Sequence, residues 1–399
     1  MISNITMEKI YQYLLILLAF LMPLTVAGAN IVIVIIVILW LFSGSYKLKF
    51  IDVFSSKLII TSVLFYLVHI LGMLWTEDLL WGAEILHKMW YFILFLPILY
   101  NIVRIKYFNY CVSAFLAAIL LTELVSYLIW FEIISPFKNA SVLNPTPFMS
   151  HVSYNPILAF AIYIVMHQMF FNKQLGKVSF FMHGFFSITM TINMFITGGR
   201  AGQVMYFAML SIFIFQFFNA EKIKSLIAIT FLIPGVFFIA YQTSPLFNER
   251  VNNAVQDVVT YEKNGNTSVG KRITYAINSW EIIKNNPILG VGTGDFPIEY
   301  EKINEANGTD TPNSHNPHNM YTLVLTQLGL VGLISMLSIF YYQIKLSFIS
   351  KNKLIRDTGL TLPLLFLVIM WSDSYLLGHF TTLVFIFFSS FLYKNFEKS

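Results

Sequence analysis

Residues 13–43 read YLLILLAFLMPLTVAGANIVIVIIVILWLFS and contain no Asp, Glu, Lys or Arg. The first apolar run is followed at once by a second, without the cleavage pattern of a secretory signal, so both are expected to be retained membrane spans. The chain of 399 residues is 57% hydrophobic and 11% charged. Soluble domains are about 45–50% apolar and about 25% charged. This composition excludes a soluble enzyme and a disordered chain, because too few polar groups exist to cover a soluble surface.

The apolar segments predict an all-α polytopic membrane protein. They lack the period-2 alternation of barrel strands, and a helical span needs roughly 20 residues. We expect about 12 transmembrane helices, in two blocks that flank a large periplasmic loop: helices 1–9 within 1–241, the loop at 242–318, and helices 10–12 with a short cytoplasmic tail within 319–399. The expected spans are 12–28, 30–43, 57–74, 85–101, 109–130, 155–172, 179–197, 201–219, 222–241, 319–342, 357–373 and 376–393.

The distribution of Lys and Arg predicts the orientation. With the N-terminus in the cytoplasm, 16 of the 25 basic residues lie on the cytoplasmic side and 9 on the other. The positive-inside rule then places both termini in the cytoplasm. The basic residues are scattered, which argues against nucleic acid as a partner. Cys111 is the single cysteine, so an intrachain disulfide is excluded, and Glu123 is a carboxylate inside a span with no evident basic partner.

The long external segment 242–318 is predicted to be folded. Residues 272–284 have helical spacing, with Ile273, Ile277, Trp280 and Ile282 or Ile283 on roughly one face. The run GVGTG at 290–294 lacks the Gly-Lys-Ser/Thr ending and the βαβ context of a nucleotide loop. We therefore interpret that run as a turn that packs the loop against the spans.

Two basic motifs face the external side. The first is TGGRAGQ at 197–203, where Arg200 stands at the membrane boundary beside Gly199. It is either an anion site, most simply for phosphate, or a short hairpin with a snorkelling arginine. The second is Lys271-Arg272 at the start of the amphipathic helix, which is either an anion site or a solvated charge pair.

The third motif is SHNPHN at 314–319, where the tenth span begins. His318 is a candidate general base, because histidine ordinarily has a pKa near ~6.5. Metal binding with His315 is the competing interpretation, although Pro317 interrupts the helical spacing and no carboxylate or thiolate completes a zinc site. The structural alternative is that Asn316 or Asn319 caps the span.

Two further groups complete the external side. His151 begins the sixth span and either lines the same cavity or caps the helix. Asp373 follows the eleventh span and is expected to face outside, where it balances an arginine.

Taken together, these motifs resemble those of the bacterial O-antigen ligase and polymerase superfamily. The resemblance rests on the Gly-Gly-Arg-Ala-Gly turn, Arg272 and Trp280, NPILGVG at 286–292 and HNPHN at 315–319, and it covers about 197–332. It implies a GT-C-like fold in the bacterial inner membrane. It also implies periplasmic transfer of a glycan from undecaprenyl diphosphate to a lipid A core sugar, with inversion and without a metal or other cofactor.

The resemblance assigns roles to particular residues. Arg200 and Arg272 would grip the diphosphate, and His318 would match the essential histidine. Relatives often have Ser-Arg where this chain has Gly-Gly-Arg, which leaves Arg200 in place. The predicted catalytic residues are therefore His318, Arg272 and Arg200, and the predicted substrate-binding residues are His315, Asn319, Lys271, Arg250, His151 and Gly199.

Other functions remain open. An O-antigen polymerase would use the same donor with a lipid-linked acceptor, and a protein O-oligosaccharyltransferase would use a protein acceptor. A transporter of lipid-linked sugars is the non-enzymatic alternative. It would require charges within the bundle, whereas most charges here lie at one face.

Overall fold

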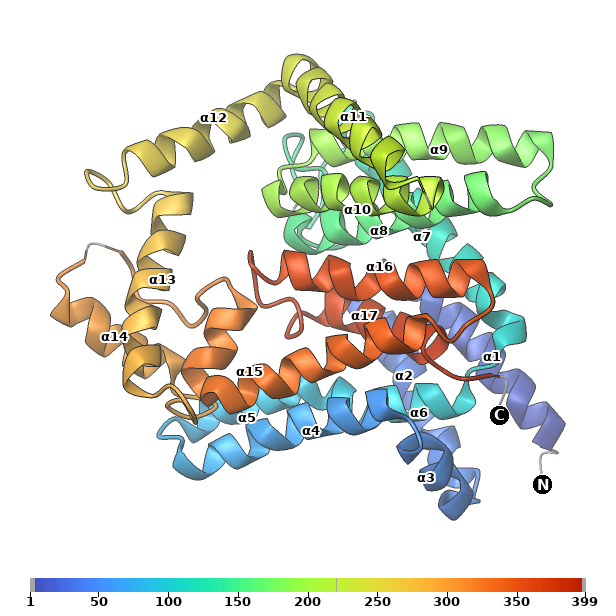
Figure 1. Ribbon diagram of the computed structural model, residues 1–399, viewed down its shortest axis with the longest axis horizontal. Coiled ribbons are helices and arrows are strands. Elements are labelled where there is room, and N and C mark those ends of the chain that lie inside the picture. Colours follow the sequence, from blue (N-terminus) through green and yellow to red (C-terminus); the bar gives the residue numbers. More distant parts are fainter. Residues whose placement is uncertain (1–3, 139, 220, 310, 397–399) are drawn as a thin grey trace.

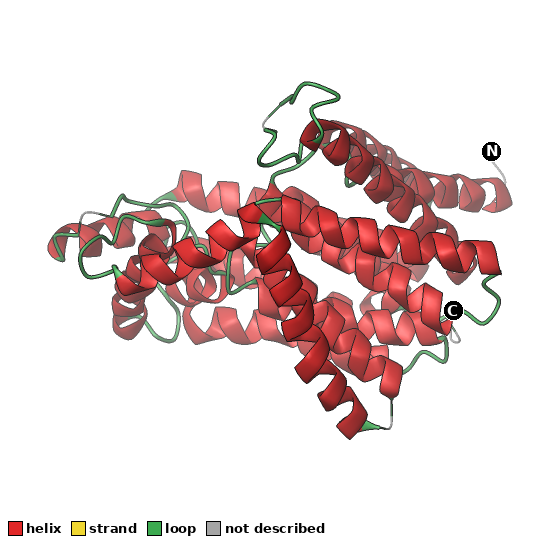
Figure 2. Ribbon diagram, turned by 90° about the horizontal axis from the view of Figure 1, so that it is seen from above, coloured by secondary structure: helices red, strands yellow, loops and turns green. Residues whose placement is uncertain are grey.

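The computed structural model describes residues 4–138, 140–219, 221–309 and 311–396. Within these ranges the chain forms helices, with one isolated β-bridge between Ser141 and Asn144 and no strands. The predicted all-α class is confirmed. In both views the two termini lie at one end of the molecule, and α12, α13 and α14 lie at the other (Figures 1 and 2).

The described helices follow one another along the whole chain. In order they are α1 (Asn4–Leu21), α2 (Val26–Phe42), α3 (Tyr46–Phe54), α4 (Lys57–Gly72), η1 (Met73–Trp75), α5 (Leu79–Trp90), η2 (Tyr91–Phe95), α6 (Leu96–Ile102), η3 (Ile105–Tyr107), α7 (Phe108–Trp130), α8 (His151–Phe171), α9 (Lys177–Ile196), α10 (Arg200–Phe218), α11 (Lys222–Thr243), α12 (Pro245–Val259), α13 (Ser268–Asn285), α14 (Phe296–Ala306), α15 (Met320–Ser347), α16 (Lys353–Ile369) and α17 (His379–Leu392).

Eight helical segments in the described part are long and apolar enough to cross a bilayer: Lys57–Trp75, Leu79–Ile102, Ile105–Trp130, His151–Phe171, Lys177–Ile196, Arg200–Phe218, Lys222–Thr243 and Met320–Ser347. A ninth is present if α2 and α3, which are bent by 120° relative to each other, form one span. The protein is therefore a polytopic membrane protein, and the count of twelve stays a prediction.

The first helical hairpin differs from its predicted boundaries. We expected a span over 12–28 and a break near residue 29, but α1 ends at Leu21 and α2 begins at Val26. Pro23 lies in the turn and has no backbone N–H to continue a helix. Thr25 then caps α2, because its side chain accepts a hydrogen bond from Gly28 N at 3.3 Å.

The core of the bundle lies among α8, α10, α15, α16 and α17. Nearly every residue of α17 is buried, and the rings of Phe115, Phe160 and Phe388 meet edge-on or tilted with centroids 5.0–6.5 Å apart. By contrast, α11 has only Ser225 and Ala240 buried. An apolar helix that buries so little against protein is suited to contact with lipid.

The Asn-Pro-x-x-Gly-x-Gly segment packs against a break in α15. Gly329 has a φ of +57° inside this helix, and the carbonyl oxygens of Thr326 and Gln327 accept hydrogen bonds of 2.9 Å from Val291 N and Gly292 N. A Cβ on Gly329 would collide with the backbone of Ile288, so glycine is required by both its φ and its surroundings. The predicted packing role of the glycine run is confirmed.

The segment 242–318, predicted as a large periplasmic loop, holds three helices, α12, α13 and α14, where the sequence predicted one. Tyr275 and Ile282 of α13 pack with Phe296 and Tyr300 of α14 and with Leu323 of α15. The predicted apolar face of α13 is buried only in part. Ile282 and Ile283 are 2% and 8% exposed. Ile277 and Trp280, by contrast, are 53% and 58% exposed. The face of α13 that carries Tyr275 and Asn278 is the one that packs against the rest of the protein.

Candidate functional site

The glycine turn before α10 brings α10 close to α8. A Cβ on Gly199 would lie 2.6 Å from Asn155 Nδ2, and a Cβ on Gly202 would collide with Asn155 Cβ. Thr197 Oγ1 donates a hydrogen bond of 2.8 Å to Asn155 Oδ1. Gly199 is itself buried in this contact, so its role is to position Arg200 at the start of α10.

Arg200, Arg250 and Arg272 form a cluster contributed by three different helices. Arg250 and Arg272 both act electrostatically on Arg200, and Arg200 Nη2 donates a hydrogen bond of 2.7 Å to Ser268 Oγ. None of the three forms a salt bridge to a carboxylate among the described residues. Arg250 Nε is buried without a hydrogen-bond partner in this part of the chain. Guanidinium groups that repel one another without a carboxylate salt bridge are an arrangement that a bound anion would stabilise.

His318 lies beside this cluster in a constrained loop. Its φ is +52°, which is unusual for a non-glycine residue, and Asn316 Oδ1 holds its backbone by accepting a hydrogen bond of 2.9 Å from His318 N. His318 Nδ1 is 3.3 Å from Asp373 Oδ1, but it is not aligned as a hydrogen bond. The His318 ring also stacks on Tyr275, with centroids 6.1 Å apart, and the imidazole stays 40% exposed.

Asp373 connects the histidine to the arginines. Burial raises the pKa of Asp373, but the His318 ring, the Ser374 amide and the Arg272 guanidinium together outweigh burial and hold the pKa below its ordinary value. Ser374 N and Asn316 Nδ2 donate hydrogen bonds of 2.7 and 3.1 Å to Asp373 Oδ1. The sequence predicted an external Asp373 that balances an arginine. It did not predict the contact with His318, because no spacing pattern links the two.

The remaining predicted residues surround this centre in different ways. Asn319 caps α15, since its Oδ1 accepts a hydrogen bond of 3.1 Å from Thr322 N, which confirms the capping interpretation. His151 Nδ1 is 2.9 Å from Asn144 Nδ2 and experiences the charge of Arg250. Lys271 is half-buried in the first turns of α13. His315 packs on Trp81 at 4.9 Å between centroids, so it and His318 have different neighbours.

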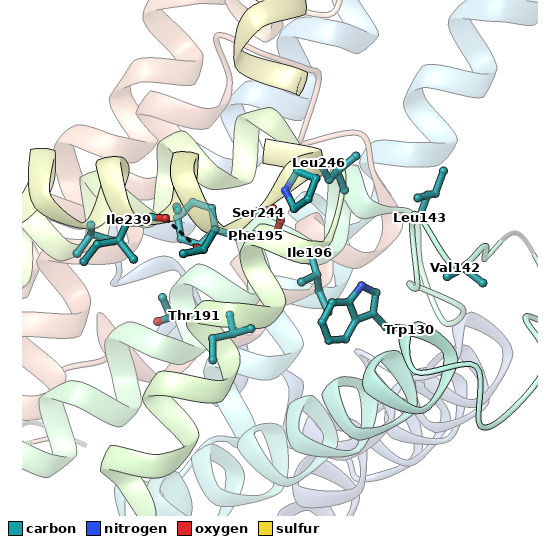
Figure 3. A pocket seen from close by; sticks show the side chains of 14 residues that line it. Trp130, Val142, Leu143, Thr191, Phe195, Ile196, Ile239, Ser244 and Leu246 are labelled. Atoms are coloured by element: carbon teal, nitrogen blue, oxygen red, sulfur yellow. Dashed lines mark hydrogen bonds between the residues drawn. The ribbon is translucent and has the colours of Figure 1, made fainter. Parts of the chain in front are cut away.

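An apolar cavity of about 560 Å³ lies next to the arginine cluster. Figure 3 shows Trp130, Phe195, Ile196 and Leu246 among the side chains around it, contributed by α7, α9 and α12. Ile239 of α11 completes the wall toward the lipid-facing surface. Leu246, which lines the cavity, and Arg250 are four residues apart on α12 and therefore lie on the same face of this helix.

Fold and site together describe a helical membrane protein with an arginine cluster and a histidine beside it. Residues 185–337 match the model of a family described as O-antigen ligase. This segment contains Arg200, Arg250, Arg272 and His318. The resemblance to the O-antigen ligase and polymerase superfamily is thereby confirmed over these residues, whereas the GT-C-like fold stays a prediction.

The chain is also similar to a protein of Haemophilus influenzae that is described only as uncharacterized. The two are 33% identical over 165 residues, which is 38% of this chain and 39% of the relative. The chain thus matches about two fifths of the length of this relative, and the match carries no information on activity.

Proposed function

We propose that the protein is an inner-membrane glycosyltransferase of the O-antigen ligase type. It would transfer a glycan from undecaprenyl diphosphate to a hydroxyl of a lipid A core sugar on the periplasmic side. The arginine cluster carries this proposal, because a diphosphate is a lipid-linked anion that suits three neighbouring guanidinium groups without a carboxylate salt bridge among the described residues.

In the proposed reaction the acceptor oxygen attacks the anomeric carbon of the donor from the face opposite the diphosphate. The new C–O bond forms as the bond to the diphosphate oxygen breaks, which inverts the configuration. Negative charge then collects on the departing diphosphate. Arg200, Arg250 and Arg272 would stabilise this charge, and their positions on three separate helices hold them ready for it.

His318 would take the proton of the acceptor hydroxyl. Asp373 lies on the Nδ1 side of the ring at 3.3 Å, so Nε2 is the nitrogen left to act as base. The carboxylate would also stabilise the imidazolium that forms. The positive φ of His318 supports a functional reading, since constrained backbone of this kind gathers at reactive sites.

The apolar cavity beside Arg250 suits the lipid part of the donor. It is bounded by α9 and the lipid-facing α11, so a polyprenyl chain could stay within the bilayer while its diphosphate reaches the arginines. Holding both substrates at the membrane surface also reduces the entropic cost of bringing them together.

An O-antigen polymerase is the second candidate, because it would use the same donor site and the same base. A transporter of lipid-linked sugars is less favoured. The helices α12 and α13, which carry Arg250 and Arg272, lie at one end of the molecule (Figure 1), whereas a transport path would run through the bundle.

The test is transfer by the purified chain in lipid nanodiscs. Undecaprenyl-diphosphate glycan and lipid A core are supplied, with a chelator present, and the product is separated by gel. We expect polymer-bearing lipid A core from the wild type and none from His318→Ala at equal folded protein. Normal transfer by His318→Ala would refute the base assignment. A deletion strain separates the candidates: loss of a ligase leaves polymer on the carrier, whereas loss of a polymerase leaves core with one repeat.

A further inference from the structure

A second cavity, of about 390 Å³, lies against Asp373 and Asn316. Asp373 lies against the His318 ring, and Asn316 accepts a hydrogen bond from the His318 backbone. The cavity is enclosed by α5, the start of α8 and the loop before α17, so it belongs to a different part of the bundle from the apolar cavity. In Figure 1, α9 and α11 lie along one side of the bundle and α4 and α5 along the other.

The walls of this second cavity combine aromatic surface with hydrogen-bonding groups. Trp81 and His315 form an aromatic wall with ring centroids 4.9 Å apart. Trp81 Nε1 is buried and has no hydrogen-bond partner among the described residues. Ser153, Asn316 and Asp373 add hydroxyl, amide and carboxylate groups. An apolar wall with a few converging donors and acceptors is what a sugar ring requires, since it has CH faces and a rim of hydroxyls.

The charges of the cavity argue against an anionic ligand. Lys88 is its only Lys or Arg, and Lys88 Nζ is already 3.3 Å from Glu84 Oε1 and lies 5.0 Å from the Trp81 ring centroid. Asp373 adds a carboxylate whose pKa is held low. A phosphate would therefore be repelled here, whereas the arginine cluster attracts it. The two sites are chemically distinct, one for an anion and one for a neutral, hydroxyl-rich group.

A further cavity, of about 460 Å³, shares Lys88 and Leu377 with the second one. It extends to Ile33 and Val34 of α2, and Val34 is 54% exposed on the outside of the helix. The two cavities are thus neighbours along α5, and the further one reaches an exposed apolar side chain of α2. A glycan bound in the second cavity could remain attached to a lipid in the bilayer.

We propose that the cavity lined by Trp81, Ser153, His315 and Asp373 binds a neutral sugar of the acceptor glycan. The inference rests on the proposed function and assigns the acceptor to a site of its own. Donor and acceptor would approach from the α9–α11 and the α2–α5 sides and meet at His318. Asp373 would serve both sites, because it borders the acceptor cavity and contacts the base.

Steady-state kinetics on the full chain in nanodiscs provide the first test, with a matched pair of tryptophan variants. Trp81→Leu removes the aromatic wall of the acceptor cavity, and Trp130→Leu does the same in the apolar cavity. We expect Trp81→Leu to raise the KM for lipid A core on the order of tenfold, the scale of losing one aromatic anchor, with the donor KM unchanged. Trp81→Phe should restore most of the loss. Trp130→Leu should leave the acceptor KM unchanged.

Three results would overturn the proposal. One is an unchanged acceptor KM in Trp81→Leu, another is a rise in the donor KM alone, and the third is an equal effect of Trp130→Leu on the acceptor KM. A wild-type chain that forms no product would instead contradict the proposed function. In that case the acceptor site would be tested by a binding measurement, which does not depend on product formation.

Thiol protection measures that binding without turnover. Cys111 is buried, so Ser153→Cys introduces one reactive thiol at the cavity wall. Core oligosaccharide freed of its lipid should slow labelling of this thiol severalfold, and inorganic phosphate should not. Leu143→Cys, at the apolar cavity, should label at the same rate with and without the oligosaccharide. Protection of Ser153→Cys by phosphate alone, or no protection by the oligosaccharide, would refute a sugar site.

Discussion

Asp373 Oδ1 lies 3.3 Å from His318 Nδ1, and the two residues flank the hairpin formed by α15 and α16. His318 comes just before α15 and Asp373 just after α16. A hydrogen bond of 2.8 Å from Met320 N to Met370 O joins the same two ends. The hairpin therefore brings a carboxylate next to the candidate base, and Arg272 of the arginine cluster acts on the same carboxylate.

We predict that Asp373→Asn lowers kcat about a hundredfold, within the range that general-base catalysis contributes. The amide carries no charge and cannot stabilise the imidazolium. The KM values for both substrates should change much less than kcat. Glu305→Gln, an exposed carboxylate of α14, is the matched control and should keep wild-type kinetics. Equal kcat values for Asp373→Asn and the wild type would show that Asp373 does not assist His318 in the reaction.

The low pKa of Asp373 also predicts a pH dependence of stability. A carboxylate whose pKa is depressed in the folded state stabilises that state above its unfolded pKa of about 3.9, and the stabilisation disappears as pH falls through the folded pKa. The Tm of the wild type should therefore exceed that of Asp373→Asn at pH 7. The difference should shrink as the pH falls below about 4. A difference that is constant between pH 7 and pH 3 would contradict the assignment.

Arg250→Ala should have opposite effects on stability and on donor affinity. Removing one of three mutually repelling guanidinium groups raises the Tm of the ligand-free protein, because Arg250 Nε has no compensating partner among the described residues. The affinity for the diphosphate donor should fall roughly tenfold, the scale of one charge-assisted contact. Inorganic pyrophosphate should raise the Tm of the wild type more than that of the variant. A lower Tm with unchanged donor affinity would mean that Arg250 is structural.

Gly202→Ala should destabilise the α8–α10 contact by about 1–3 kcal/mol, the usual cost of overpacking. The added methyl group would collide with Asn155 Cβ. Gly235→Ala in α11 is the control, because no atom lies within 4 Å of its Cβ position. That change should be neutral or stabilising, since alanine favours helix by about 1 kcal/mol. Thermal unfolding in detergent compares the two, and equal Tm values would refute the close approach.

Gly329→Ala and Gly308→Ala test the break in α15. Both glycines have a φ of +57°, so alanine is strained at both positions, and the ψ of −153° at Gly329 makes a combination that essentially only glycine adopts. Only Gly329 faces the backbone of Ile288, whereas Gly308 has open space. Gly329→Ala should therefore lower the Tm clearly more and make the 287–292 segment more sensitive to protease. An equal loss of Tm in the two variants would mean that the 287–292 segment accommodates the added methyl group at Gly329 without further loss of stability.

The elements of the fold could be predicted from hydropathy because each span carries its own signal. Each of the twelve predicted segments overlaps a helix, and errors arose where a local breaker outweighed the apolar pattern, as at Pro23. The external helices were harder, because α12 and α14 are polar and their one-sided burial depends on partners distant in the chain. The inward face of α13 was predicted only in part for the same reason.

The sequence alone determined that this is a helical membrane protein, and it predicted Arg200, Arg250, Arg272 and His318 as site residues from short motifs and side-chain chemistry. Only the tertiary structure decided that Asp373 contacts His318, that His315 packs on Trp81, and that two cavities lie on different sides of the site. Hydropathy and local motifs depend on neighbours along the chain. The pairing of helix ends depends instead on how long-range packing folds the bundle, and no local pattern encodes it.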